Sequence, residues 1–457
     1  MTEKDIQKYI WDHKNDWKSL LVNARFPTNE KSDNPTHLTP AEAMFNLVVE
    51  KTRILYNSLE YLEFFGCEVP LRKKGKSTIR ADFLGIMGGG NGIAIIELKK
   101  GKKTERQSFT ELLAYSGHLR TVFAPMGKMD IVYVIIAPMK ERIVREAIVN
   151  CLLYENMRTI ALVPEFENDD VSTLKLNPWI PSFKEIEQLT NSCFSERNFD
   201  VFKITWEALE GEWSPEKGVK NPDEHMIDRM NEVSAIAAQV MEAKGINGFV
   251  FSTQSFSETR ELLPLANGLV LCGLNPYKAT KNRFLKTERN LSVKEADNID
   301  IVEVNLLDII PELEKSAKNE NIETNFLGFL SLAWDNEMTG IGFDIVQTLT
   351  KSLDQESIIT DYGGFNWDDY QSKFLEDIYC HNFKMRLTGL LRKLFFEYAK
   401  LDYDYIREYG HEEHFQYADG DIPNFLVDIS NSQFFVRNFI RRLFNPYYEF
   451  EDDFDLS

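Results

Sequence analysis

Two acidic residues and a lysine, Asp82, Glu97 and Lys99, have the types and the spacing to act on a phosphodiester. Glu97 and Lys99 end the strand-like run Ile93–Lys99, and Asp82 lies fifteen residues before Glu97 in a second such run. Strand side chains alternate between faces, so Glu97 and Lys99 share one face, and Asp82 joins them if the runs form a hairpin. Two carboxylates and an ammonium on one face can hold Mg²⁺ or Mn²⁺ and orient a water beside a phosphodiester.

The alternative for these residues is purely structural. Glu97 and Lys99 could form an ordinary exposed ion pair at the edge of a sheet, which is a common and weakly stabilising arrangement. That interpretation leaves Asp82 and the surrounding basic residues without a role. We therefore favour the metal site, with Asp82 and Glu97 as its side-chain ligands.

Two neighbouring helices offer further candidates for the site. On the first, Glu50, Glu60 and Glu63 compete and Glu50 is favoured over Glu60, although a helix face that is simply solvated is the alternative. On the second, Gln107, Glu111 and Tyr115 follow one another at intervals of four and share a helix face that would point to the metal site. Gln107 also completes a capping box with Thr104, which explains it without any chemistry.

Basic residues flank the proposed site on both sides. They form a turn before the second run and a segment that leads into the next helix, where backbone N–H groups also favour phosphate. The sequence predicts a rim for nucleic acid, although solvated loops explain the charges equally well. The residues are Arg72, Lys73, Lys74, Lys76, Lys100, Lys102, Lys103 and Arg106, and we expect Tyr115 on the following helix to contact nucleic acid as well.

The elements that position these residues can be predicted from periodicity and turn signals. We expect an α-β-β-β-α-β order continued by one more helix and strand, with a mixed sheet of four or five strands. A glycine-rich connection, residues 88–92, joins the second and third strands. The expected helices are 39–65, 104–120 and 140–156, and the expected strands are 67–71, 79–87, 93–99, 130–137 and 158–163.

The motif residues resemble the PD-(D/E)XK superfamily, the restriction-endonuclease-like nucleases. The similarity comprises Arg80–Gly85, then Ile95–Lys99, then the segment from Gln107 to Tyr115, within residues 40–163. Ala81 stands where the family's nominal proline would be. The resemblance implies a restriction-endonuclease-like α/β core, Mg²⁺ or Mn²⁺ as cofactor, a main-chain ligand from Leu98, and hydrolysis of DNA.

The pattern changes after Pro164, where we place a domain boundary. We expect residues 1–38 to be an N-terminal extension, 39–165 the nuclease-like domain, 181–320 an acidic α/β module and 321–457 a mostly helical module. In the third segment we predict a helix over 222–244 and strands at 248–252, 268–272 and 299–305. In the last we predict helices over 366–401 and 432–444, and a frayed acidic tail.

Charge is divided unevenly along the 457 residues. Residues 1–160 hold 24 Lys and Arg against 19 Asp and Glu, a net charge of +5, whereas the remainder carries −25 of the total of −20. A mildly basic front half suits a polyanionic partner. No run of about 20 apolar residues is present to span a bilayer, and five scattered cysteines suggest free thiols in a cytoplasmic protein.

These features favour a metal-dependent DNA endonuclease with an acidic regulatory or assembly half. A role in restriction or anti-phage defence, as a homodimer or within a larger complex, follows from family analogy. Two alternatives stay open: a repair or recombination nuclease that acts on branched or damaged DNA, and a catalytically silent domain that only binds DNA or a protein.

Overall fold

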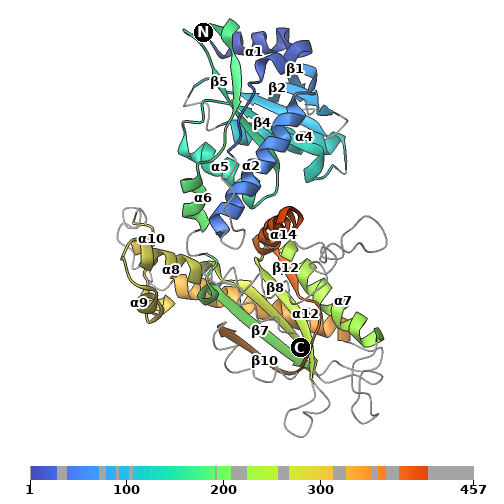
Figure 1. Ribbon diagram of the computed structural model, residues 1–457, viewed down its shortest axis with the longest axis vertical. Helices are drawn as coiled ribbons and strands as arrows, with labels where there is room; N and C mark the ends of the chain where they lie inside the picture. Colours follow the sequence, from blue (N-terminus) through green and yellow to red (C-terminus); the bar gives the residue numbers. More distant parts are fainter. Residues whose placement is uncertain are drawn as a thin grey trace. The chain divides into compact units, whose positions relative to one another are not determined.

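The computed structural model describes twelve stretches of the chain, which form parts of two compact units (Figure 1). The first unit comprises residues 1–31 and 41–187, and the second extends from Gln188. The described residues are 2–27, 39–71, 79–88, 92–101, 107–124, 126–190, 193–206, 224–255, 267–311, 326–350, 359–366 and 380–409.

The first unit is built on a six-stranded mixed sheet in the order β1-β2-β3-β4-β5-β6. The pairs β1–β2 and β2–β3 are antiparallel, β3–β4 and β4–β5 are parallel, and β6 returns antiparallel to β5. The α/β class and the mixed sheet are thus confirmed. The strands are β1 Glu63–Leu71, β2 Ile79–Ile86, β3 Ile93–Leu98, β4 Ile131–Ile136, β5 Arg158–Glu165 and β6 Lys175–Pro178.

Helices cover both faces of this sheet (Figure 1). Ile96 and Val134 pack with residues of α1, η1 and α2 in one core cluster. Because strand side chains alternate, the buried Ile95 and Ile135 face the opposite side, where α4 packs on β2 and β3. The helices are α1 Glu3–Asp12, η1 Lys14–Leu20, α2 Pro40–Leu59, α4 Ser108–Val122, η4 Lys128–Asp130, α5 Arg142–Leu153, η5 Val171–Thr173 and α6 Phe183–Thr190.

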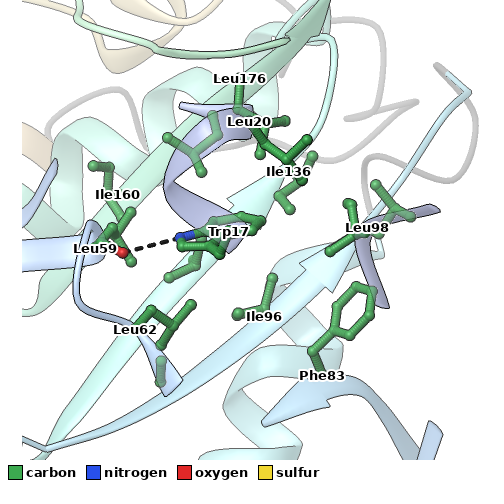
Figure 2. Close-up of a cluster of buried hydrophobic side chains, with 14 of the residues drawn as sticks. Trp17, Leu20, Leu59, Leu62, Phe83, Ile96, Leu98, Ile136, Ile160 and Leu176 are labelled. Atoms are coloured by element: carbon green, nitrogen blue, oxygen red, sulfur yellow. Dashed lines mark hydrogen bonds between the residues drawn. The ribbon is translucent and has the colours of Figure 1, made fainter. Parts of the chain in front are cut away.

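Trp17 closes the core on the α1 side of the sheet (Figure 2). Its ring is 2% exposed, and its Nε1–H donates a 2.9 Å hydrogen bond to the carbonyl of Leu59. Figure 2 also shows Phe83, Ile96 and Leu98 of β2 and β3 in the same cluster. Residues 14–20 are therefore integral to the first unit, which corrects the prediction that 1–38 is a separate extension.

Two other predictions for this unit differ from the structure. The helix expected to reach Phe65 ends at Leu59, because Phe64 pairs with Gly85 in β1–β2 and packs edge-on against Trp17. The boundary expected after Pro164 is not where the unit ends. β5 continues to Glu165 and pairs with β6, so the unit extends to residue 187.

The second unit contains a separate sheet in the order β10-β7-β9-β8-β11, with β12 also on β8. All of its described pairings are antiparallel. The strands are β7 Phe199–Trp206, β8 Gly248–Ser255, β9 Asn267–Leu274, β10 Ile359–Asn366, β11 Cys380–Asn382 and β12 Arg386–Thr388. The helices are η6 Glu196–Asn198, α7 Glu224–Ala243, α8 Pro276–Thr287, α9 Val293–Asp297, η9 Ile301–Glu303, α10 Leu306–Ile309, α12 Phe326–Thr350 and α14 Gly389–Tyr409.

Sequence patterns predicted α7, β8 and β9 but not the rest of this sheet. The strand expected over 299–305 is wrong: Asp300 and Asn305 accept hydrogen bonds from backbone amides two residues on, which favours turns and caps over a strand. The helix expected over 366–401 is wrong for the described residues 380–388, where β11 and β12 pair with β8, while residues 367–379 lie outside the described part of the chain. The division at residue 320 also differs from the structure, because β10 pairs with β7.

Several predictions cannot be compared with the structure. The helix expected over 432–444 and the acidic tail lie outside the described residues.

None of the described helices is long and apolar enough to cross a bilayer.

Candidate active site

The predicted hairpin brings Asp82 to Glu97 and Lys99. β2 and β3 pair antiparallel with Phe83 opposite Ile96, which sets Asp82 beside the end of β3. The Leu98 backbone N–H donates a 2.8 Å hydrogen bond to Asp82 Oδ2. The side chain of Leu98 faces the core on the other side, so only its main chain can serve the site.

Glu97 and Lys99 form a buried ion pair. Lys99 Nζ lies 2.5 Å from Glu97 Oε1, and the two residues are 8% and 1% exposed. β3 is a central strand, between β2 and β4. The alternative of an exposed pair at a sheet edge is therefore wrong. Burying a charged pair costs several kcal/mol per ion before any attraction is counted, and packing alone offers no reason for that cost.

Helix α4 contributes a third carboxylate. Glu111 Oε2 lies 2.7 Å from Lys99 Nζ, and Tyr115 lies one turn further on. Tyr115 is buried, and this burial, followed by the nearby carboxylates of the cluster, raises its pKa. The predicted shared face is confirmed for this pair. Gln107 is exposed at the start of α4 and makes no side-chain cap, while Thr104 lies outside the described residues.

Glu97 and Glu111 interact directly. Glu97 Oε2 is buried without a hydrogen-bond donor among the described residues, whereas Glu111 Oε2 lies 2.7 Å from Lys99 Nζ. Burial, followed by the neighbouring carboxyls of Glu111 and Asp82, raises the pKa of Glu97 far above its usual range. Glu97 therefore takes up a proton more readily than an exposed glutamate does when no cation is near.

The same contacts shift the pKa values of Glu111, Lys99 and Asp82. Burial of Glu111 would raise its pKa, but the hydrogen bond with Glu97 and the charge of Lys99 lower it overall. Burial of Lys99 would lower its pKa, but its bonds to Glu111 and Glu97 raise it, so the ammonium stays charged. Burial raises the pKa of Asp82 to about 6, against the opposing effects of the Leu98 amide and Lys99.

The donor chemistry of this cluster fits a hard divalent cation. Three carboxyl groups face one ammonium, and an unpartnered buried oxygen, Glu97 Oε2, is left over. Among the described residues, no three His, Cys, Asp or Glu side chains could hold a metal ion by themselves. Mg²⁺ is usually bound by only one or two carboxylates together with waters and substrate phosphates, so Asp82, Glu97 and the Leu98 main chain would suffice.

Glu50 is not brought to this cluster. Its two carboxylate oxygens accept hydrogen bonds of 2.8 and 2.7 Å from Arg53 on an exposed part of α2. The structure thus gives Glu50 a local partner, and the choice of Glu50 as a site residue is not supported.

Most of the predicted basic rim cannot be placed. Lys100 lies two residues after the end of β3 and is half-buried. Tyr115, which we expected to contact nucleic acid, is 4% exposed and lies against the carboxylates, not on an exposed rim. The remaining predicted contacts, Arg72, Lys73, Lys74, Lys76, Lys102, Lys103 and Arg106, lie outside the described residues.

Two residues of α1 were missed by the sequence reasoning. Gln7 Nε2 donates a 3.2 Å hydrogen bond to Asp82 Oδ1, and Glu3 Oε2 accepts a 2.9 Å hydrogen bond from the backbone N–H of Lys100. A signal was available, since Thr2 and Asp5 form a capping box that marks a helix start. Nothing in the sequence indicated which part of the sheet this helix would cover.

Comparison of the chain with protein-family models, curated proteins and solved structures gave no match.

Proposed function

We propose that the first unit is a metal-dependent nuclease that hydrolyses DNA phosphodiester bonds. The observation that carries the proposal is the buried cluster of Asp82, Glu97 and Lys99 on a central hairpin, with Glu111 as a second partner of the lysine. The order α2-β1-β2-β3-α4-β4 is compatible with a restriction-endonuclease-like core, which we propose as the fold of this unit.

Each residue of the cluster has a role in this chemistry. Asp82 and Glu97 hold Mg²⁺ or Mn²⁺, which when bound lowers the pKa of a water and neutralises charge on the phosphate. Lys99 donates hydrogen bonds to the phosphoryl oxygens as negative charge develops on them. Glu111 keeps Lys99 charged and in place while Glu97 binds the cation. Water adds across the P–O bond, which leaves one phosphate end and one hydroxyl end.

A catalytically silent binding domain is the second candidate. It is favoured by one observation, that Lys99 is already ion-paired with both Glu97 and Glu111 without any cation. In that case the cluster is a buried polar network that fixes the hairpin, and neither metal nor strand cleavage is involved.

The test is cleavage of supercoiled, linear and branched DNA, and of RNA, with Mg²⁺, Mn²⁺ or EDTA. Wild type is compared with Asp82→Ala and Lys99→Ala, and with Lys8→Ala on the exposed side of α1 as the matched control. We expect metal-dependent DNA cleavage that both site variants lose and the control keeps. A preference for branched DNA would favour a repair role. If folded wild type cleaves none of these substrates, the nuclease proposal fails and the silent domain is favoured.

A further inference from the structure

Helix α1 touches the candidate site at two points. Gln7, which is 9% exposed, donates from Nε2 to Asp82 Oδ1. Glu3, one turn earlier on the same face, accepts from the backbone N–H of Lys100, two residues after the end of β3. Since residues four apart share a helix face, one stripe of α1 faces the ends of β2 and β3.

The helix is held firmly enough to position a side chain. Thr2 and Asp5 form a complete capping box at its start, and Ile6 and Ile10 are fully buried in the core shared with the sheet. At its other end, Tyr9 Oη donates a 3.0 Å hydrogen bond to the carbonyl of Ser172. Gln7 therefore lies on a firmly anchored helix and not on a loop.

Asp82 is fixed by two donors from different elements. Its Oδ2 accepts from the Leu98 amide of β3 at 2.8 Å, and its Oδ1 accepts from Gln7 of α1 at 3.2 Å. The two bonds hold the two oxygens separately, so the plane of the carboxylate is set by both. Without Gln7, only the bond from Leu98 restrains it. Partners that orient a ligating carboxylate typically contribute about 10–100-fold to metal affinity or activity.

We propose that Gln7 is a positioning residue that orients Asp82 for a divalent cation, which makes α1 part of the active site. This inference rests on the proposed function. It predicts a defect in metal binding and turnover, with DNA binding left intact, because the side chain of Gln7 is buried against Asp82 and is not presented to a substrate.

The test uses full-length Gln7→Met, which keeps the length of the side chain but removes the donor, and Gln7→Asn, which keeps the amide but withdraws it by one methylene. Lys8→Met, at the exposed neighbouring position, is the control. Three quantities are measured: Mn²⁺ affinity by calorimetry without DNA, kcat and KM for Mn²⁺-dependent cleavage, and the urea midpoint.

We expect both Gln7 variants to unfold cooperatively, to bind Mn²⁺ about tenfold more weakly and to lose about tenfold in kcat, with KM for DNA unchanged. The proposal is overturned if a folded Gln7→Met binds Mn²⁺ and turns over within twofold of wild type. It is overturned as well if both variants fail to fold, because Gln7 would then serve the fold. Absence of Mn²⁺ binding and cleavage in wild type would instead overturn the proposed function.

Discussion

Replacement of Lys99 by methionine tests how the buried cluster balances its charge. Lys99 lies 2.5 Å from Glu97 Oε1 and 2.7 Å from Glu111 Oε2. The Lys99–Glu111 attraction alone is about 6 kcal/mol at an effective dielectric constant of about 20, before the cost of desolvation is subtracted. Loss of one partner of a buried pair costs about 3–5 kcal/mol.

The net loss should be smaller than that for two reasons. The Glu111 side chain is 36% exposed, so solvent screens part of the charge left behind. Burial also raises the pKa of Glu97, so this carboxyl takes up a proton more readily and leaves less uncompensated charge than a free glutamate would. We therefore expect Lys99→Met to lower the free energy of unfolding by about 2 kcal/mol at pH 7.5. For a unit of this size, that lowers Tm by about 4–8 °C.

The stability difference between wild type and Lys99→Met should depend on pH. In wild type the pKa of Glu111 is lowered, so Glu111 contributes stability above its unfolded-state pKa of 4.5, and this contribution is lost as pH falls through its folded pKa. Without Lys99, much of that contribution disappears. The difference between wild type and Lys99→Met should therefore be full above about pH 5.5 and shrink toward pH 4.

The assay is urea unfolding of both proteins from pH 4 to 8, followed by near-UV circular dichroism. Lys8→Met, on the exposed side of α1, controls for the loss of a lysine. A loss under about 0.5 kcal/mol at pH 7.5, as for a surface pair, or a loss that does not shrink on acidification, would refute this account of the cluster.

Three further substitutions test the described packing. Trp17→Phe removes the donor to the Leu59 carbonyl and should cost about 1–3 kcal/mol in urea unfolding; an unchanged midpoint would contradict the role of that bond. Gly389→Ala should lower Tm of the second unit, because φ is +60° and a Cβ would lie 2.3 Å from Asn247 Oδ1; an unchanged Tm would contradict this geometry. Asp335→Asn should stabilise the second unit by about 1 kcal/mol at pH 7.5 after allowance for solvent screening. Burial, followed by Asp200, raises the Asp335 pKa to about 6, so this gain should vanish below about pH 4, and an equal gain at both pH values would contradict it.

The local pattern was sufficient to predict the hairpin and its cluster. The alternation of the run 93–99 fixed which side of the sheet Glu97 and Lys99 share, and spacing by four placed Glu111 and Tyr115 on one helix face. Both inferences depend only on strand and helix periods, which hold within a single element. The fold class of the first unit followed in the same way.

Contacts between distant elements could not be predicted. Gln7 reaches Asp82 across 75 positions of sequence, and β10 pairs with β7 across more than 150. No local pattern encodes such a partner, so residues 1–38 were assigned to an extension and the second sheet was largely missed. The choice of Glu50 had the same weakness, because helix periodicity does not tell which element its face meets, and the structure pairs Glu50 with Arg53.

Glu97→Gln gives the most direct test of the central claim that Glu97 is buried as a ligand and not as a structural group. Glutamine has nearly the shape of the glutamate side chain and carries no charge, and burial raises the Glu97 pKa, so the variant should keep the unfolding free energy of wild type within about 1 kcal/mol. With Mn²⁺ and supercoiled DNA, its cleavage rate should fall by at least about 100-fold, while Glu146→Gln on the exposed face of α5 cleaves normally. A stable Glu97→Gln that cleaves at the wild-type rate would contradict the account.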